Sequence, residues 1–234
     1  MGKENYFNAD YLQSRKKTLK ELKEYAESEL LKPQKNWNIV WVLSGPEINF
    51  SGDINPGEKA VPNYNQTKSR FETGLKIARE VTALRLNKQS ENVTKEDIAN
   101  NGPSIYFNSG PASNNFIREI ARPNNLLETE YNFPGQKVII TNNENIKHTG
   151  DQFQDFPAEI VEPNTKVVIV SALQHYPRIR RYAQKYPDKL PPEQVILYPV
   201  PIEKNIMPVS EYLGEIKRIY PYQKKGFLPP EAKK

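Results

Sequence analysis

An α/β fold, with a mainly parallel sheet and helices on both of its faces, is predicted by two features of the sequence. Five short runs of β-branched and aromatic residues are apolar at consecutive positions, which is typical of strands covered on both faces. Helical or loop-like segments separate the runs, so the connections are expected to be right-handed crossovers between parallel strands. The pattern leaves the order of the strands in the sheet open.

The first half of the chain supplies two helices and two strands. Leucines at helical spacing predict an amphipathic helix that ends before a proline, and the runs NIVWVLSG and SIYFNSG predict strands. A stretch rich in Gly, Pro, Asn and Asp predicts a long loop, which we expect to act as a lid, and a polar stretch predicts a connector. In chain order these are the helix 10–31, the strand 38–45, the loop 46–65, the helix 65–86, the connector 87–103 and the strand 104–110.

The second half continues the alternation. Ser113 is expected to cap a short helix, and Pro177 fits the first turn of another. The runs QKVIIT, TKVVIVSA and QVILYPVP predict strands, and VSEYLGEIKRIY predicts a last helix. These elements are the helix 113–121, the strands 136–141 and 165–172, the helix from residue 177, the strand 194–201 and the helix 209–220.

Composition places these elements in one domain with two appendages. We expect an accessory amino-terminal helix in residues 1–35, an α/β domain in residues 36–222 and a flexible tail in residues 223–234. There are no cysteines, which excludes disulfides, thiolate nucleophiles and Cys-ligated metals. No apolar run is long enough for a membrane span, so a cytoplasmic protein is expected. The net charge of +5 agrees with an anionic partner and equally with simple solubility.

Two of the predicted strands end in the same tripeptide, Ser-Gly-Pro, at residues 44–46 and 109–111. Ligands of open parallel sheets bind beyond the carboxyl ends of the strands, where loops and helix amino termini expose backbone N–H groups. Glycine permits close approach of a ligand, although any tight turn between strand and helix also favours Gly and Pro. We therefore expect both turns, with Ser44 and Ser109, at one edge of the sheet.

Both histidines of the chain also follow predicted strands. His148 begins HTGDQF, and His175 begins HYPRIRR. Arg178 lies about one helical turn beyond His175, so the two side chains can face one spot and form a phosphate or carboxylate site. Instead of a functional role, each histidine can be a hydrogen-bonded structural residue. The arginines of HYPRIRR, at positions 178, 180 and 181, can likewise form a solvated basic helix face.

Five segments together resemble a known family. They are VLSGPE (42–47), KSRFETGLKIA (68–78), NSGPA (108–112), HTGDQF (148–153) and SALQHYPRIRR (171–181). In this order they resemble the YdcF/SanA/ElyC family of bacterial domains of unknown function, except that Pro46 and Pro111 replace glycines and the membrane anchor of many relatives is missing. The resemblance implies a three-layer Rossmann-like fold with a small-molecule site over the strand ends, and it makes S-adenosylmethionine a candidate cofactor.

The residues and the resemblance leave three functions open. The first is an enzyme, a transferase or hydrolase, acting on an anionic small molecule such as a nucleotide, a sugar phosphate or a nucleotide-linked precursor. In it His175 is the catalytic acid or base, and the ligand-binding residues are Ser44, Gly45, Glu47, Arg70, Ser109, Gly110, His148, Thr149, Gln152 and Arg178. The second is a non-catalytic module that binds a nucleotide or S-adenosylmethionine through the same residues. Nucleic-acid binding ranks third because the basic residues are dispersed and no recognition motif is present.

Other catalytic motifs are missing from the sequence. It contains no phosphate loop of the G-x-x-x-x-G-K-[ST] type, no G-x-G-x-x-G fingerprint, no G-x-S-x-G nucleophile turn and no H-E-x-x-H zinc helix. Glu47 and Asp151 are suitable metal ligands by residue type alone, so no metal site is predicted.

Overall fold

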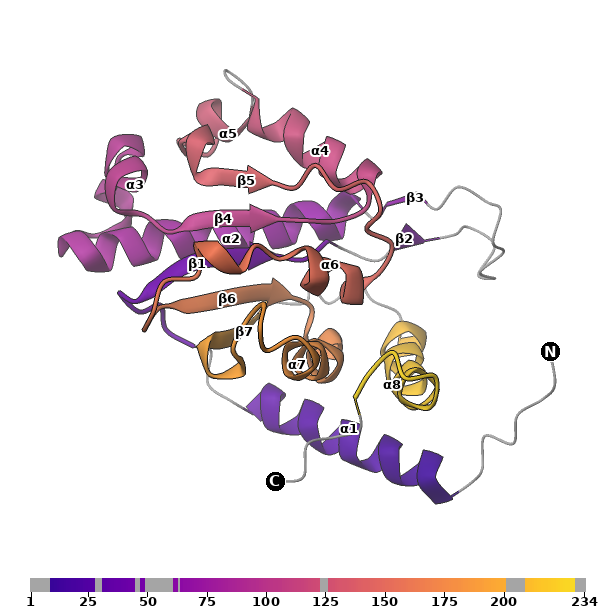
Figure 1. The fold of residues 1–234 in the computed structure, drawn as a ribbon. Coiled ribbons are helices and arrows are strands. Elements are labelled where there is room, and N and C mark those ends of the chain that lie inside the picture. Colours follow the sequence, from indigo (N-terminus) through magenta and orange to yellow (C-terminus); the bar gives the residue numbers. More distant parts are fainter. Residues whose placement is uncertain are drawn as a thin grey trace.

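The computed structural model describes residues 9–27, 31–44, 47–48, 61–62, 64–122, 126–200 and 209–229. Five strands form one sheet in the order β5-β4-β1-β6-β7, and every neighbouring pair is parallel. Their bounds in chain order are β1 (Trp37–Val42), β4 (Ser104–Phe107), β5 (Val138–Ile140), β6 (Lys166–Ser171) and β7 (Val195–Pro199). The predicted parallel α/β sheet is thus confirmed, and all five carboxyl ends lie at one edge (Figure 1).

The helices and the remaining strands complete the fold. A two-stranded antiparallel pair, β2 (Glu47–Ile48) with β3 (Val61–Pro62), occupies the ends of the predicted long loop. The rest of that loop, and with it our expectation of a lid, lies outside the described residues. The helices are α1 (Ala9–Glu27), α2 (Tyr64–Leu86), α3 (Lys95–Asn101), α4 (Pro111–Ala121), α5 (Leu126–Thr129), α6 (Thr149–Asp155), α7 (Tyr176–Lys185) and α8 (Val209–Lys224).

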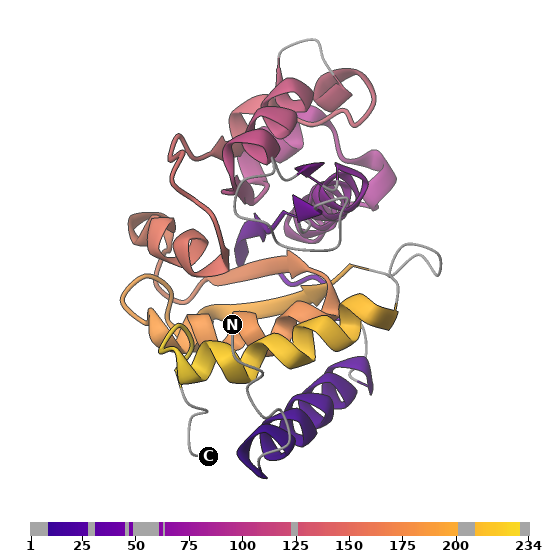
Figure 2. The same cartoon turned by 90° about the vertical axis from the view of Figure 1, so that its right-hand side faces the viewer.

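Alternating side chains of the strands fill two separate cores, as expected for a sheet buried on both faces. On one face Val40, Val42 and Phe107 pack with residues of α2 and α4. On the other face Trp41 and Ile169 pack with residues of α6, α7 and α8. The molecule therefore has the three layers of a Rossmann-like fold, with the sheet in the middle (Figures 1 and 2).

Helix α1 lies outside these layers, where it packs on α7 and α8 (Figure 2). Its attachment includes a bidentate ion pair in which Arg181 Nη1 and Nη2 donate to the Glu21 carboxylate at 3.0 and 3.1 Å. The Arg181 side chain is 2% exposed and the Glu21 side chain 18%, so the pair is largely shielded from water between the helices. At the other terminus, packed structure extends past residue 222, because Leu228 is 1% exposed and belongs to the core under α7.

Four helices differ from the sequence prediction: α3, α5 and α6 were not predicted, and α4 begins earlier than expected. Residues 95–101, expected in a connector, form α3 because Thr94 and Asp97 form a reciprocal capping box. Helix α4 begins at Pro111 with Gly110 as its cap, so the prediction of Ser113 as the capping residue is wrong. Ser113 lies inside the first turn and is fully buried.

Candidate functional site

The strand order creates a switch point between β1 and β6. From β1 the chain moves outward through β4 to β5, and it then returns to the other side of β1 to form β6 and β7. The loops after β1 and β6 therefore leave in opposite directions, which opens a crevice at their carboxyl ends. Backbone hydrogen bonds to β6 continue one residue past the ends of β1 and β7. Leu43 N–H donates to the Val170 carbonyl at 3.1 Å, and Val200 N–H donates to the Ser171 carbonyl at 3.0 Å.

Ser44 and Ser109, the first residues of the two Ser-Gly-Pro tripeptides, meet at this edge. The hydroxyl oxygens of Ser44 and Ser109 lie 2.6 Å apart, which confirms the prediction that both turns share one sheet edge. Asn114 of α4 holds the second turn in place, because its side chain accepts from Ser109 N–H at 2.9 Å and donates to the Ser109 carbonyl at 2.8 Å. Gly110 caps α4, so the second tripeptide carries the chain directly from strand to helix.

Arg70 reaches the same edge from α2. Its Nη1 donates to the Leu43 carbonyl at 3.2 Å and, over a shorter distance, to the Ser44 carbonyl. The side chain is 2% exposed. The guanidinium therefore fixes the turn after β1 and places a positive charge beside Ser44, where the sequence predicted an anion ligand.

The end of β6 carries a second polar pair. Ser171 Oγ and His175 Nδ1 lie 3.3 Å apart, and both side chains are buried. His175 immediately precedes α7, whose Pro177 lies in the first turn as predicted. The ring therefore lies at the amino terminus of α7, where backbone N–H groups and the helix dipole favour an anion. The bond to Ser171 controls which ring nitrogen carries the proton.

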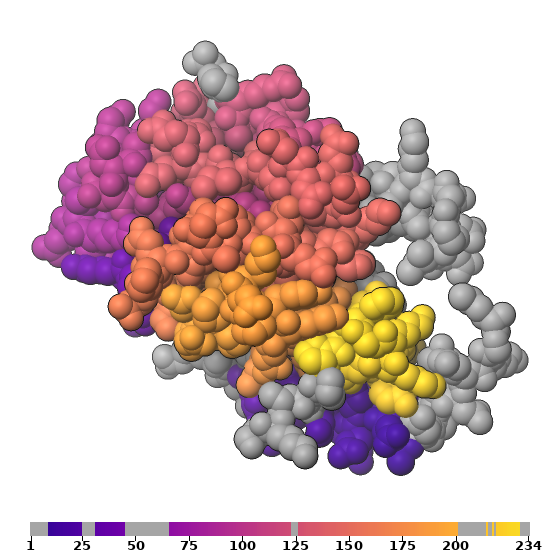
Figure 3. Space-filling model, viewed as in Figure 1, coloured from indigo at the N-terminus to yellow at the C-terminus, as the bar shows by residue number. Residues whose placement is uncertain are grey.

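Arg178 and the start of α6 meet around Tyr182. A Cβ on Gly150 would lie 3.0 Å from Tyr182 Cε1, so the backbone of α6 at Gly150 lies directly against the Tyr182 ring. Burial raises the pKa of Tyr182 to about 12, and the nearby positive charge of Arg178 opposes part of this rise. Figure 3 shows the α6 segment, in salmon, adjoining the α7 segment, in orange, at the surface.

His148 itself caps α6. Its Nδ1 accepts from Asp151 N–H at 3.2 Å, and the Asp151 carboxylate accepts in return from His148 N–H at 3.1 Å. The side chain is 57% exposed. His148 therefore has a structural role as the cap of α6, which was one of the two alternatives for each histidine. Thr149 follows it as the first residue of the helix.

A buried amide network supports the edge below these groups. Asn108 Oδ1 accepts from Trp41 Nε1 at 2.7 Å, and Asn108 Nδ2 donates to the Gln152 carbonyl at 2.7 Å. Gln152 Nε2 donates in return to the Asn108 carbonyl at 2.6 Å. Gln152, predicted to orient a ligand, thus uses its amide nitrogen to connect α6 to the end of β4.

The predicted site residues form two groups at the carboxyl edge. Arg70, Ser44 and Ser109 lie at the ends of β1 and β4, and Arg70 approaches from the α2 face. His175 and Arg178 approach from the opposite face, on which α7 lies. Of the remaining predictions, Glu47 begins β2, and Gly45 lies outside the described residues.

Sequence reasoning missed Ser171, Asn108 and Gln174. Within the described residues, Gln174 Oε1 and Ser113 Oγ are buried and have no hydrogen-bond partner; Gln174 follows β6, and Ser113 lies in the first turn of α4. Buried polar atoms of this kind require an explanation. A polar residue directly after an apolar run was the available signal for Ser171 and Asn108.

Comparisons with known proteins find no relative: no family model, curated protein or solved structure matches the chain. In the described part of the chain, no helix combines the length and the apolar character needed to cross a membrane. The same residues hold no group of three His, Asp or Glu side chains arranged to bind a metal ion.

Proposed function

We propose that the chain binds an anionic small molecule at the carboxyl ends of β1 and β6, and that His175 transfers a proton to or from it. The observation that carries this proposal is the Ser171–His175 pair, which lies at the strand switch point and at the start of a helix. Buried histidines with an oriented ring are suited to acid–base chemistry, and open parallel sheets bind ligands at this point.

The electrostatics favour a phosphate or carboxylate. Arg70 and Arg178 bring positive charge to the same edge from opposite faces, and α4 and α7 both begin there. Phosphate groups bind where helix amino termini and guanidinium groups combine. We infer a ligand such as a nucleotide, a sugar phosphate or a nucleotide-linked precursor, and a transferase or hydrolase reaction on it.

The tautomer of His175 decides its role in this scheme. When Nδ1–H donates to Ser171 Oγ, Nε2 carries the lone pair and the ring acts as a base. When Ser171 Oγ–H donates to Nδ1, Nε2 carries the proton and the ring acts as an acid. Ser171 is therefore a positioning residue in this proposal.

A non-catalytic module for a nucleotide or S-adenosylmethionine is the second candidate. It is favoured by the buried Gln174 and Ser113 oxygens, which provide polar contacts for a ligand without taking part in proton transfer. It also agrees with the resemblance to the YdcF/SanA/ElyC family. In this case binding requires the edge residues, and no turnover occurs.

Thermal unfolding in the presence of ADP, glucose 1-phosphate, UDP-glucose or S-adenosylmethionine tests the binding proposal. A probe at a hundred times its dissociation constant stabilises the fold by about 2.7 kcal/mol. We expect Arg178→Met to remove this stabilisation and the exposed neighbour variant Arg180→Met to retain it. Failure of all four probes, or equal loss in both variants, contradicts the proposal.

Turnover then separates the two candidates. With a probe that binds, product formation is followed for the wild type and for His175→Gln. Loss of turnover with retained binding supports the enzyme. Binding of the probe without any turnover in the wild type supports the module.

A further inference from the structure

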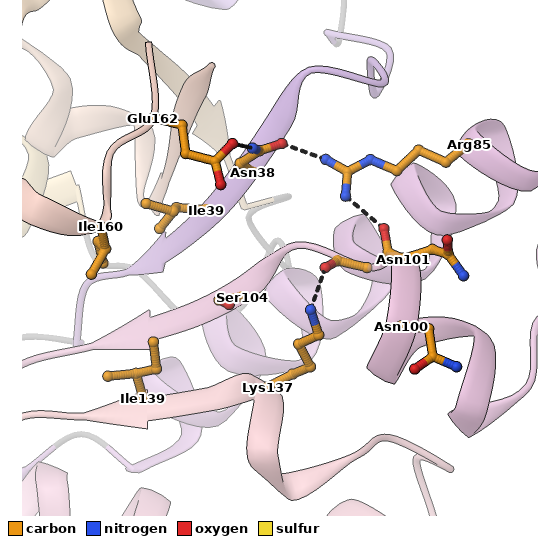
Figure 4. A pocket seen from close by; sticks show the side chains of 11 residues that line it. Asn38, Ile39, Arg85, Asn100, Asn101, Ser104, Lys137, Ile139, Ile160 and Glu162 are labelled. Atoms are coloured by element: carbon orange, nitrogen blue, oxygen red, sulfur yellow. Dashed lines mark hydrogen bonds between the residues drawn. The ribbon is translucent and has the colours of Figure 1, made fainter. Parts of the chain in front are cut away.

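The amino edge of the sheet, opposite the candidate site, holds a pocket of about 430 Å³ (Figure 4). It lies where β1, β4 and β5 begin, between the end of α3 and the segment before β6. Its size falls within the range of small-molecule sites. Its lining includes Asn38, Arg85, Lys137, Ile139, Ile160 and Glu162.

Arg85 is held on one side of this pocket by protein oxygens. It donates to the carbonyls of Lys35, Trp37 and Asn101 and to Asn38 Oδ1. Asn38 Nδ2 donates in turn to the Glu162 carboxylate at 2.9 Å, as Figure 4 shows. The guanidinium is therefore engaged with the chain, and Asn38 links it to Glu162, which supplies the one carboxylate among the residues that line the pocket.

Lys137 lies apart from that carboxylate. Its Nζ donates to the Gly102 carbonyl at 2.9 Å, which uses one of its three donors. Within the described residues it forms no ion pair with a carboxylate. Burial lowers the pKa of Lys137, and repulsion from Arg85 lowers it further. An anion in the pocket would offset both effects.

The neighbouring wall is apolar. Ile139 of the edge strand β5 is 38% exposed, a large fraction for an isoleucine within a sheet, and Ile160 is half-buried beside the same pocket. Figure 4 shows both side chains on the side of the pocket away from Arg85. Inorganic phosphate would leave this wall in contact with water, whereas an aliphatic chain would cover it.

We propose that this amino-edge pocket binds a small organic carboxylate with an aliphatic body. The carboxylate accepts hydrogen bonds from Lys137 Nζ, and the aliphatic body packs against Ile139 and Ile160. The pocket is independent of the carboxyl-edge site, because the length of the sheet separates the two.

Isocaproate is a suitable probe, and amide proton–nitrogen correlation spectra of the whole chain report its position. We expect saturable shifts of the Gly102, Ser104 and Ile139 amides. Isocaproamide, which has the same shape without the charge, is expected to bind about tenfold more weakly, because the charge-assisted hydrogen bond is lost. Equal binding of the amide, tighter binding of inorganic phosphate, or shifts confined to other residues would overturn the proposal.

Three variants complete the test. Lys137→Gln is expected to weaken isocaproate binding about tenfold, whereas Lys76→Gln, on the exposed surface of α2, is expected to leave it unchanged. Lys137→Arg keeps the charge and is expected to retain isocaproate binding within about threefold of the wild type. Ile139→Asn is expected to weaken isocaproate binding by removing the apolar wall, while the hydrogen bond from Lys137 to the Gly102 carbonyl is kept. The spectra report folding of each variant directly, and unchanged affinity in folded Lys137→Gln would reject the site.

Discussion

The hydroxyl of Ser44 lies 2.6 Å from the hydroxyl of Ser109, although 65 residues separate them in the chain. This hydrogen bond joins the turns after β1 and β4 at the edge that we propose as the ligand site. Its neighbours Arg70 and Asn114 hold the backbone of each turn. The geometry of the edge is therefore set by side chains that bind other parts of the protein.

The first prediction concerns this pair. Ser44→Ala and Ser109→Ala are each expected to lower the free energy of unfolding by about 1 kcal/mol, because each removes one partner of a part-buried hydrogen bond. In the double variant the losses are expected to be less than additive by about 0.5 kcal/mol or more. Urea unfolding of the four proteins measures this coupling, and strict additivity would show that the bond contributes nothing.

Asn108 carries the second prediction. Asn108→Ala leaves Trp41 Nε1 and the Gln152 carbonyl without their partners in a buried region. We expect a loss of about 3 kcal/mol in the free energy of unfolding. Asn115→Ala on the exposed face of α4 is the control, with an expected loss of about 0.5 kcal/mol or less. Equal losses in the two variants would contradict this account.

The sequence predicted the sheet well because its strands are short runs of β-branched residues that are buried on both faces. Each strand of the five-stranded sheet overlaps its predicted run, although β1 begins one residue earlier, at Trp37, and Ser44 and Ser109 lie at the same edge as expected. Helix α3 was missed although Thr94 and Asp97 have the spacing of a capping box. That signal was present in the sequence and was read as part of a polar connector.

Side-chain partners were less predictable, because they depend on how the elements pack. Arg70 was expected to bind a ligand, and its position on α2 brings it to the carbonyls of Leu43 and Ser44. Local sequence contains no information about that distance. The amino-edge pocket around Lys137 was missed for the same reason, since its walls come from segments that only the strand order brings together.

The third prediction tests the attachment of α1. Glu21→Ala removes the carboxylate partner of the buried Arg181, and breaking such a pair costs about 3 kcal/mol. Glu24→Ala, one turn away on the exposed face, disrupts only a 3.9 Å contact with Lys20 and is expected to cost about 0.5 kcal/mol or less. Chemical unfolding of Glu21→Ala and Glu24→Ala measures the loss in the free energy of unfolding of each variant. If the two variants were equally stable, α1 would not contribute to the cooperative fold.

The fourth prediction uses two glycines in helices. A Cβ on Gly74 of α2 would lie 2.7 Å from Val42 Cγ2, so Gly74→Ala is expected to destabilise by about 1–3 kcal/mol through overpacking. A Cβ on Gly214 of α8 meets no atom within 4 Å, so Gly214→Ala is expected to stabilise by about 0.5–1 kcal/mol through helix propensity. Thermal unfolding should therefore show shifts of opposite sign.

The last prediction concerns alkaline pH. Burial raises the pKa of Tyr182 to about 12, whereas an unfolded tyrosine has a pKa of about 10. The folded state therefore favours the neutral phenol. This contribution to stability is complete below pH about 10 and disappears as the pH rises through about 12. Tyr182→Phe keeps the ring that stacks on Phe153 and removes the ionisable group, so its stability is expected to fall less steeply over this interval.

Urea midpoints measured at a series of alkaline pH values test this for Tyr182→Phe against the wild type. Tyr186→Phe is the matched control, because it removes a half-buried phenol at the end of the same helix, where Gln154 Nε2 donates to it at 2.9 Å. Absorbance of the phenolate gives an independent measure of the ionisation. If the wild type and Tyr182→Phe lost stability in parallel over this pH interval, ionisation of the Tyr182 phenol would not contribute to the alkaline loss of stability, and the raised pKa would be wrong.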